Sequence, residues 1–380
     1  MTTIAVISES DDKEHRIGLS PETVKKFSAL GCKVQVQSGA GEGARFSDES
    51  YAEAGASVVK SASAALKGAD ILLAVRRPPA NAVKELGGNG ILIGLLEPFD
   101  DHGGLKTLAK TGVTAFAVEF MPRISRAQSM DVLSSQSNLA GYKAVVDAAA
   151  AFDRAMPMMM TAAGTVPAAR VFIMGAGVAG LQAIATARRM GAVVTATDVR
   201  PAAKEQVESL GAKFIAVEDE EFKQAETAGG YAKEMSDDYK AKQAALVAEH
   251  LRSQDIVITT ALIPGRPAPV LITKAMVETM KPGAIIADLA AERGGNCELT
   301  KPGKDVEKHG VTIMGRLNLP GEVAVNASSL YARNLYAFVE PLIDKETKKL
   351  AVNWDDEVVK GTLIAKGGAL VHPALTKKMD

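Results

Sequence analysis

The stretch Arg170-Val-Phe-Ile-Met-Gly-Ala-Gly-Val-Ala-Gly180 decides the fold of this chain. It opens with a short apolar run, Val171–Met174, of the kind that forms a buried strand. A helical segment at 181–190 and a second apolar run at 193–197 follow, and the second run ends at Asp198. The glycines between strand and helix fit the pattern G-x-G-x-x-G; they are Gly175, Gly177 and Gly180. Strand, glycine turn, helix, strand and acid in this order predict a dinucleotide-binding βαβ unit.

Each residue type in this stretch has a physical task. Gly175 allows a tight turn, Gly177 lets a pyrophosphate approach the backbone, and Gly180 lets helix and strand pack closely. The helix N-terminus offers N–H groups and a partial positive charge to the phosphates. Asp198 can accept hydrogen bonds from an adenosine ribose and would repel a 2′-phosphate, which favours NAD over NADP. Arg200 weakens that preference, because a nearby arginine can accommodate a 2′-phosphate.

Composition excludes several classes of protein. The 380 residues are enough for two domains, and the net charge of -1 predicts no nucleic-acid-binding surface. Two cysteines argue against a disulfide framework and fit a reducing compartment. The N-terminus reads as a strand without a signal peptide, and the longest apolar runs are strand-sized. A soluble cytoplasmic protein without a membrane span is therefore expected, and we expect no metal site.

The pattern of elements predicts an α/β chain with two βαβ domains and a cleft between them. The first domain comprises 1–137 together with 327–380, because the C-terminal β-like stretches, 349–353 and 361–365, are too few to fold alone. The second, 138–326, is a doubly wound Rossmann domain. Its strand candidates are 171–174, 193–197, 213–217, 255–260, 284–289 and 311–314. A helix from Val132 to about Met156 joins the domains.

Three segments allow more than one interpretation. Met156-Pro-Met-Met-Met160 fits core or interface packing better than a thioether metal cluster. The charged connection 218–242, with Gly229-Gly230-Tyr231, is either a surface loop or a mobile lid. The polar segment 121–131 reads on composition as a solvated linker, although its side chains could orient a carboxamide and ribose hydroxyls. Those side chains are Arg123, Arg126, Gln128 and Asp131, with Ser134 following.

At this polar segment the chain resembles a known family. The stretch 121–142, from Met-Pro-Arg-Ile-Ser-Arg to Leu-Ala-Gly-Tyr, is similar to the NAD(H)-binding component of proton-translocating nicotinamide nucleotide transhydrogenase. The similarity continues through 158–167, 175–180, 227–235 and 259–265, and so covers nearly the whole chain. The resemblance implies a homodimer of two-domain subunits that bind NAD(H). It also implies hydride transfer to or from NADP(H) on an NADP-binding component, coupled to proton movement by a membrane-spanning component.

The resemblance also assigns roles to residues. Arg123, Gln128 and Asp131 match the loop that holds the dihydronicotinamide, and we expect them to be the catalytic group. The implied cofactor-binding residues are Arg123, Gln128, Asp131, Ser134, Gly175, Gly177, Val178, Gly180, Asp198, Val199, Arg200, Gly230, Tyr231, Ala261 and Leu262. Hydride transfer between two nicotinamides needs orientation but no general acid. The implied location is peripheral, at the inner face of the cytoplasmic membrane.

Alanine dehydrogenase is the rival family, since it shares the motif His15-Arg16-Ile-Gly-Leu-Ser-Pro21. In those enzymes the position of Arg16 holds the keto-acid carboxylate, and a Lys and a His complete the site. Arg76 and Leu96 stand at the corresponding positions here, which weighs against amino-acid oxidation. An NAD-sensing regulatory module is the non-enzymatic alternative, and it would bind the cofactor without turnover.

Overall fold

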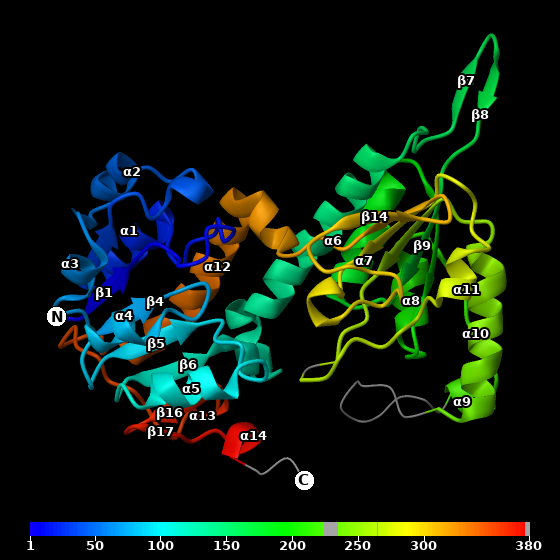
Figure 1. The fold of residues 1–380 in the computed structure, drawn as a ribbon. Coiled ribbons are helices and arrows are strands. Elements are labelled where there is room, and N and C mark those ends of the chain that lie inside the picture. The colour runs from blue at the N-terminus through cyan, green and yellow to red at the C-terminus, as the bar shows by residue number, and fades with distance from the viewer. Residues whose placement is uncertain (224–234, 264, 377–380) are drawn as a thin grey trace. The chain divides into compact units, whose positions relative to one another are not determined.

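The computed structural model describes residues 1–223, 235–263 and 265–376, which form two compact units (Figure 1). Unit 1 comprises Met1–Gln136 and Pro320–Asp380, and unit 2 comprises Ser137–Leu319. The sequence places the second boundary later, between 326 and 327. It falls earlier in the structure because helix α12 (Ala324–Val339) packs with its whole length in unit 1, where its buried side chains join the core.

Unit 1 is built on an eight-stranded sheet within the described residues, in the order β17-β16-β6-β5-β4-β1-β2-β3. Strands β1 to β6 run parallel, and β16 and β17 add an antiparallel edge. The strands are β1 (Thr3–Val6), β2 (Lys33–Gln37), β3 (Ser57–Val59), β4 (Ile71–Leu73), β5 (Ile91–Gly94), β6 (Thr114–Ala117), β16 (Leu363–Lys366) and β17 (Ala369–Leu370).

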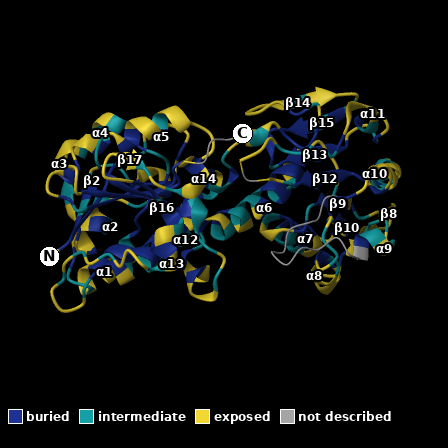
Figure 2. Ribbon diagram, turned by 90° about the horizontal axis from the view of Figure 1, so that it is seen from below, coloured by how far each residue is buried: buried dark blue, intermediate teal, exposed yellow. Residues whose placement is uncertain are grey.

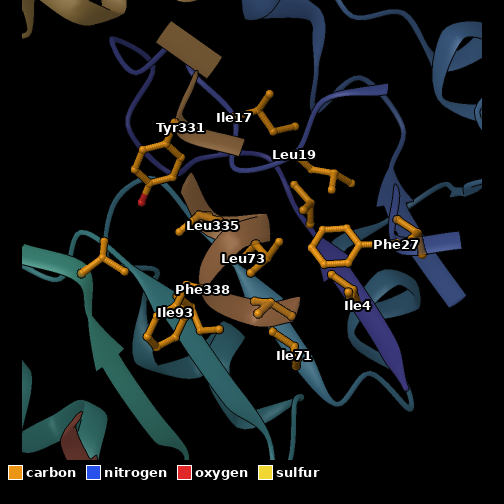
Figure 3. Close-up of a cluster of buried hydrophobic side chains, with 14 of the residues drawn as sticks. Ile4, Ile17, Leu19, Phe27, Ile71, Leu73, Ile93, Tyr331, Leu335 and Phe338 are labelled. Carbon is orange, nitrogen blue, oxygen red and sulfur yellow. The ribbon is translucent and has the colours of Figure 1, made fainter. Parts of the chain in front are cut away.

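Short helices cover this sheet. They are α1 (Pro21–Ala29), α2 (Asp48–Glu53), α3 (Ala62–Leu66), α4 (Ala80–Lys84), α5 (His102–Ala109), α13 (Glu357–Thr362) and α14 (Pro373–Thr376), with 3₁₀ turns η1 (Glu42–Ala44), η2 (Val118–Phe120), η3 (Ser125–Met130) and η6 (Glu340–Leu342). Ser20 begins α1 with a capping box, and Pro21 stands at N1. Helix α12 supplies Tyr331, Leu335 and Phe338 to the core beside the strand residues (Figure 3).

Unit 2 contains a seven-stranded sheet in its described part, in the order β11-β10-β9-β12-β13-β15-β14. All neighbours are parallel except β14 and β15, so the first six strands follow the doubly wound order 3-2-1-4-5-6. The strands are β9 (Arg170–Met174), β10 (Val193–Thr197), β11 (Lys213–Phe214), β12 (Ile256–Thr259), β13 (Ile285–Asp288), β14 (Asp305–Lys308) and β15 (Val311–Met314). The predicted Rossmann topology is confirmed.

The helices around this sheet are α7 (Val178–Arg189), α8 (Ala203–Ser209), α9 (Glu220–Lys223), α10 (Asp237–Leu251) and α11 (Lys274–Val277), with the 3₁₀ turn η4 (Ala291–Arg293). Helix α6 (Val132–Ala151) and the turn η5 (Leu319–Val323) cross the boundaries between the units. The central strands of both sheets are buried, whereas the edge strand β14 and the helices carry exposed residues (Figure 2). None of the described helices has the length and apolarity needed to cross a membrane.

Several predicted elements are wrong in detail. Helix α6 ends at Ala151, short of Met156. The residues after it form a two-stranded hairpin, β7 (Met159–Thr161) and β8 (Gly164–Val166), whose strands are exposed throughout. Met156 is buried, but Met158, Met159 and Met160 are 56%, 44% and 76% exposed, so core packing is wrong for these three. The hairpin projects from unit 2 and has no layer to cover it among the described residues (Figure 1).

The C-terminal segment also differs from the prediction. The stretch 349–353 forms no strand; a single bridge joins Ile343 and Leu350. The predicted strand 361–365 begins only at Leu363, because Asp356 caps helix α13 with bonds to Val358 N and Val359 N. Glu357–Thr362 is thereby committed to the helix.

Candidate functional site

The glycine turn of unit 2 has a separate steric reason for each glycine. Gly175 has φ +102°, and a Cβ there would lie 2.5 Å from Thr260 Oγ1. A Cβ on Gly180 would lie 1.8 Å from the carbonyl oxygen of Gly175, which no side chain can occupy. A Cβ on Gly177 would meet nothing within 4 Å, so that position leaves open space beside the backbone. This is the geometry that a pyrophosphate needs to approach the turn.

Helix α7 begins at this turn with its N-terminus uncapped. Gly177 is the N-cap and provides no side-chain hydrogen bond to the first turn. Val178, the first helical residue, is 41% exposed. The first N–H groups of a helix lack partners inside the helix and attract anions. The predicted glycines and Val178 therefore lie together at the end of β9, where open space meets the N-terminus of α7.

Asp198 stands at the neighbouring strand end, after β10. Its Oδ2 accepts from Ala176 N at 2.7 Å, which ties the acid to the glycine turn. Arg200 donates through its backbone N (2.8 Å) and Nε (2.9 Å) to Oδ1, and through Nη2 (3.0 Å) to Oδ2. Val199 between them is 51% exposed. The acid and the arginine predicted for the ribose end thus lie together at the edge that carries the turn.

The third neighbouring strand end, after β12, carries Ala261 and the exposed Leu262. The backbone there is held by Asn296, which the sequence patterns do not reveal. Asn296 is fully buried; it accepts from Ala261 N at 3.0 Å and donates to Ala261 O (2.9 Å) and Pro269 O (2.8 Å). Its position after Gly294-Gly295 gives no local sign of this role, because the contact joins residues 35 apart. Gly230 and Tyr231, predicted for the lid, lie outside the described residues.

The polar segment of unit 1 is an ordered turn as well as a connection. η3 buries Ala127 and Met130 and leaves Gln128 exposed. Arg123 is exposed on the same segment. Arg126, which the sequence suggests as a binding residue, forms an ion pair at 2.8 Å with Asp356, the cap of α13. Its guanidinium therefore already has a partner in unit 1. The segment therefore has a fixed inner side and a solvent-facing side.

Asp131 and Ser134 are brought together where η3 meets α6. The carboxylate of Asp131 accepts from Ser134 N at 3.0 Å and from Ser134 Oγ at 2.5 Å. Asp131 thus caps the first turn of α6, a structural task that adds to its predicted role. All four predicted residues of this segment lie in one short region of unit 1: Arg123, Gln128, Asp131 and Ser134.

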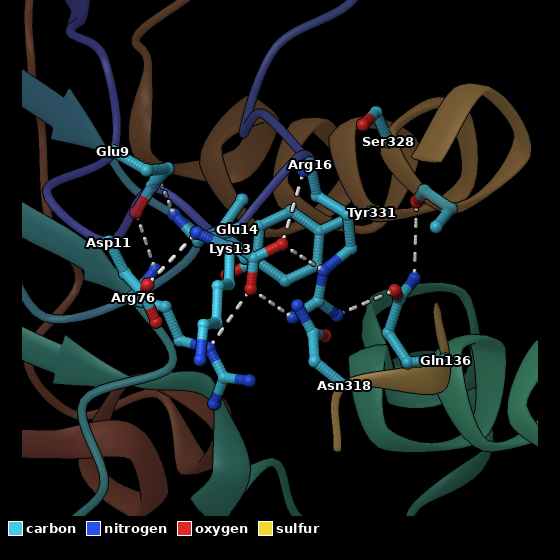
Figure 4. Close-up of polar contacts among 12 residues, drawn as sticks. Glu9, Asp11, Lys13, Glu14, Arg16, Arg76, Gln136, Asn318, Ser328 and Tyr331 are labelled. Carbon is cyan, nitrogen blue, oxygen red and sulfur yellow. Dashed lines mark hydrogen bonds and ion pairs between the residues drawn. The ribbon is translucent and has the colours of Figure 1, made fainter. Parts of the chain in front are cut away.

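A cluster of charged side chains fills the carboxyl edge of the unit 1 sheet (Figure 4). Arg16 donates to Glu14 through Nε (2.7 Å) and Nη2 (2.6 Å), and both side chains are almost fully buried. Arg76 joins Glu14 (3.0 Å) to Glu97 (3.2 Å). Burial by itself raises the pKa of the Glu14 carboxyl, but the bonds and charges of Arg16 and Arg76 lower that pKa below its ordinary value.

Two further carboxyls at this edge behave differently. Burial raises the pKa of Glu9 to about 7, despite bonds from Val75 N and Arg76 N. Burial likewise raises the pKa of Glu119 to about 7; its Oε1 accepts from Glu97 N, and its enclosed Oε2 has no partner among the described residues. The pKa values of these two carboxyls therefore lie closer to neutral pH than the pKa of an ordinary glutamate.

Both units match the models of one protein family. Residues 5–140 match the alanine dehydrogenase/PNT N-terminal domain, and residues 144–373 match the alanine dehydrogenase/PNT C-terminal domain. A curated relative from Rhodospirillum rubrum, the first piece of a divided NAD(P) transhydrogenase subunit alpha, is 56% identical over 378 residues, 98% of each chain. The chain belongs to the alanine dehydrogenase/PNT family, in its transhydrogenase alpha-subunit branch.

Solved structures separate the two branches of this family. The transhydrogenase from Sinorhizobium meliloti matches with a TM-score of 0.89 and 55% identity, covering 98% of this chain and 100% of that chain. An L-alanine dehydrogenase matches with a TM-score of 0.82 but only 26% identity, covering 98% of each chain. Alanine dehydrogenase is therefore a distant relative of this chain, and the transhydrogenase subunit is a near one.

Proposed function

We propose that this chain is the NAD(H)-binding component of a proton-translocating transhydrogenase. It binds NAD(H) on unit 2 and orients the nicotinamide with the polar segment of unit 1. The hydride passes to or from NADP(H) held by an NADP-binding component, and a membrane-spanning component couples the transfer to proton movement. The observation that carries this proposal is the phosphate-binding turn bonded to Asp198, in a chain whose near relatives are transhydrogenase alpha subunits.

NAD(H) is the proposed cofactor because of the charge at the ribose end. Asp198 offers two carboxylate oxygens, and the extra 2′-phosphate of NADP(H) would meet that negative charge at close range. NADH is expected to bind much more tightly than NADPH in equilibrium titration, and Asp198→Ala is expected to weaken NADH and narrow the gap. Equal affinities of the unmodified chain for NADH and NADPH would contradict this cofactor assignment.

Amino-acid oxidation is disfavoured by the filled edge of unit 1. The guanidinium of Arg16, at the position that binds a keto-acid carboxylate in the dehydrogenase branch, is already bonded to the buried Glu14. Arg76, which stands where those enzymes have a lysine, is engaged by Glu14 and Glu97. Hydride transfer between two nicotinamides moves no proton, so it needs only close and oriented approach. The exposed Gln128 and the neighbouring Asp131 can supply that orientation.

The test is a hydride-transfer assay. Mixed with the NADP-binding component of a transhydrogenase, the chain is expected to transfer hydride from NADH to an NADP analogue without a membrane. Gln128→Asn and Asp131→Asn are expected to lower the single-turnover rate by up to about 100-fold, because an error of about 1 Å in aim costs that much. NADH affinity stays within a small factor, since adenosine and pyrophosphate contacts lie on unit 2. The exposed Ser125→Ala in the same turn is the matched control. Unchanged transfer rates in both variants would indicate that 121–131 is only a solvated linker.

A homodimer is part of the proposal and is supported by the hairpin of β7 and β8. Three methionines on or beside it are exposed, and Val166 on β8 is 36% exposed. Such contiguous apolar exposure marks an interaction surface. Met160→Lys is expected to shift the chain toward monomer in sedimentation velocity, whereas the surface substitution Leu210→Lys on unit 2 is not. A dimer that persists in Met160→Lys would show that the hairpin does not form the dimer interface.

The proposed location follows from the proposed function. We place the assembled chain in the cytoplasm, peripheral to the inner face of the cytoplasmic membrane.

A further inference from the structure

The polar segment of unit 1 is anchored from behind by one buried side chain. Asn334 lies on α12 and is 9% exposed. Its Nδ2 donates to the carbonyl oxygen of Ser129 at 2.7 Å, and its Oδ1 accepts from Ser135 Oγ at 2.7 Å. Ser129 is the residue between Gln128 and Met130 in η3. One amide therefore fixes a peptide of the turn and, through Ser135, the first turn of α6.

A hydrogen-bonded chain backs this amide. Ser135 Oγ accepts from Gln136 Nε2 at 3.2 Å, and Gln136 Nε2 also donates to Ala327 O on α12 at 3.1 Å. Gln136 Oε1 in turn accepts from Arg16 Nη1 at 2.9 Å, and Arg16 is held by Glu14 (Figure 4). Gln136 and Arg16 are 6% and 3% exposed, so this chain is screened from solvent. The buried ion pair and the polar segment are thus joined by consecutive hydrogen bonds within unit 1.

We propose that Asn334 is a positioning residue for hydride transfer: through the Ser129 peptide it fixes where Gln128 and Asp131 point. Arg16, Gln136 and Ser135 hold Asn334 in that orientation. The proposal rests on the function proposed above, in which the polar segment aims the reacting ring. Asn334 itself touches the peptide rather than the cofactor, so it acts through η3.

Two features of η3 make such an anchor necessary. A 3₁₀ turn has poor internal hydrogen-bond geometry and is rarely rigid by itself. η3 also packs on unit 1 through its buried Ala127 and Met130, and Arg126, which is about half exposed, pairs with Asp356. Apolar contacts do not fix the rotation of a turn about its axis, and an exposed ion pair contributes little. The bond from Asn334 is directional and buried, and so it sets the rotation.

The experiment uses Asn334→Asp with Asn326→Asp as its matched control. Asp keeps the acceptor for Ser135 but replaces the donor with an oxygen that repels the Ser129 carbonyl. Asn326 lies on the same helix and is exposed, so the same chemical change there leaves the polar segment alone. Three quantities are measured for each variant: the NADH dissociation constant, the single-turnover transfer rate with the NADP-binding component, and hydrogen exchange of the amides at 124–131.

Asn334→Asp is expected to lower the transfer rate about 30- to 100-fold and to change NADH affinity less than about threefold. It is also expected to speed exchange at 124–131. Ser135→Ala should lower the rate by a smaller factor, since it removes only the support of the amide. Asn334→Gln, which keeps the donor on a longer arm, should recover part of the rate.

Three outcomes would overturn this role. The first is an equal transfer rate in Asn334→Asp and Asn326→Asp. The second is a loss of NADH affinity as large as the loss of rate, which would indicate general damage. The third is unchanged exchange at 124–131, which is decided without any partner component. Absence of transfer with the unmodified chain would instead overturn the proposed function, and the exchange comparison would still decide whether Asn334 anchors the turn.

Discussion

The glycine turn of unit 2 and the polar segment of unit 1 are organised by different kinds of contact. In unit 2, a hydrogen bond between Ala176 and Asp198, 22 residues apart, ties together two adjacent strand ends. In unit 1, the carbonyl oxygen of Ser129 in η3 accepts from the side chain of Asn334, which is 205 residues away in the chain. The first site is set mainly by the backbone of the glycine turn and by the acid at the adjacent strand end, and the second by a side-chain bond from a distant helix. A sequence pattern can therefore specify the first site but only mark residues of the second.

The strongest test of this contrast compares two glycines of the same turn. Gly180→Ala puts a Cβ 1.8 Å from the Gly175 carbonyl oxygen, so strand β9 and helix α7 must separate. We expect a loss of more than about 4 kcal/mol in the stability of unit 2 and no measurable NADH binding. Thermal unfolding and NADH titration measure the two effects.

Gly177→Ala is the control for that substitution. A Cβ there meets nothing within 4 Å, so the fold of unit 2 should be unchanged. NADH binding should nevertheless weaken, because the methyl group occupies the side from which the pyrophosphate approaches. If both glycines tolerated alanine equally, local sterics would not organise this site, and the contrast between the units would be lost.

The same contrast explains which regions of the molecule the sequence predicts. Strand order and the glycine turn in unit 2 follow from apolar runs and spacing, because parallel βαβ connections leave few topologies. The antiparallel additions escape prediction, since β14 and the hairpin of β7 and β8 carry too little apolar alternation to stand out. The roles of four residues are proposed through resemblance: Arg123, Gln128, Asp131 and Ser134. Neither approach identifies Asn296 and Asn334, because a side-chain amide that bonds to a distant carbonyl leaves no pattern in the neighbouring sequence.

A second prediction tests whether the buried ion pair supports the long-range organisation of unit 1. Arg16→Met removes the two side-chain bonds of Arg16 to Glu14, whose side chain is 1% exposed, and leaves Arg76 in contact with that carboxylate. Breaking one side of a buried pair costs about 3 kcal/mol or more when the remaining charge is uncompensated. We expect a loss of stability of about 2 to 3 kcal/mol here, because Arg76 still compensates part of the charge of Glu14. Unfolding of unit 1 can be followed by the fluorescence of Trp354, the single tryptophan of the chain, which lies under Lys366 at 3.2 Å.

Glu14→Gln in the Arg16→Met background separates charge from packing. If the stranded carboxylate is the cause, removing its charge should restore part of the lost stability. A single variant as stable as the unmodified chain would mean that Arg16 does not support unit 1, and the bond to Gln136 would then contribute nothing to the order of the polar segment.

The smallest expected effect concerns protonation at the carboxyl edge of unit 1. Glu119 has a folded-state pKa raised to about 7, and its Oε2 is enclosed without a partner among the described residues. Because the raised pKa belongs to the folded state, the stability it contributes is present below about pH 4.5 and is lost as pH rises through about 7. Glu119→Gln cannot ionise and should escape this loss. Between pH 5 and pH 8, the unmodified chain is therefore expected to lose about 2 kcal/mol more stability than Glu119→Gln. Denaturant unfolding followed by the fluorescence of Trp354 measures this difference.

Two controls accompany this measurement. The exposed Glu85→Gln should show the same pH dependence as the unmodified chain, and Glu9, whose pKa is similarly raised, should leave a residual pH dependence in Glu119→Gln. Parallel pH profiles for Glu119→Gln and the unmodified chain would mean that Glu119 is charged at neutral pH. The edge of unit 1 would then resemble the edge of unit 2, where the carboxylate of Asp198 accepts bonds from donors of the glycine turn and of Arg200.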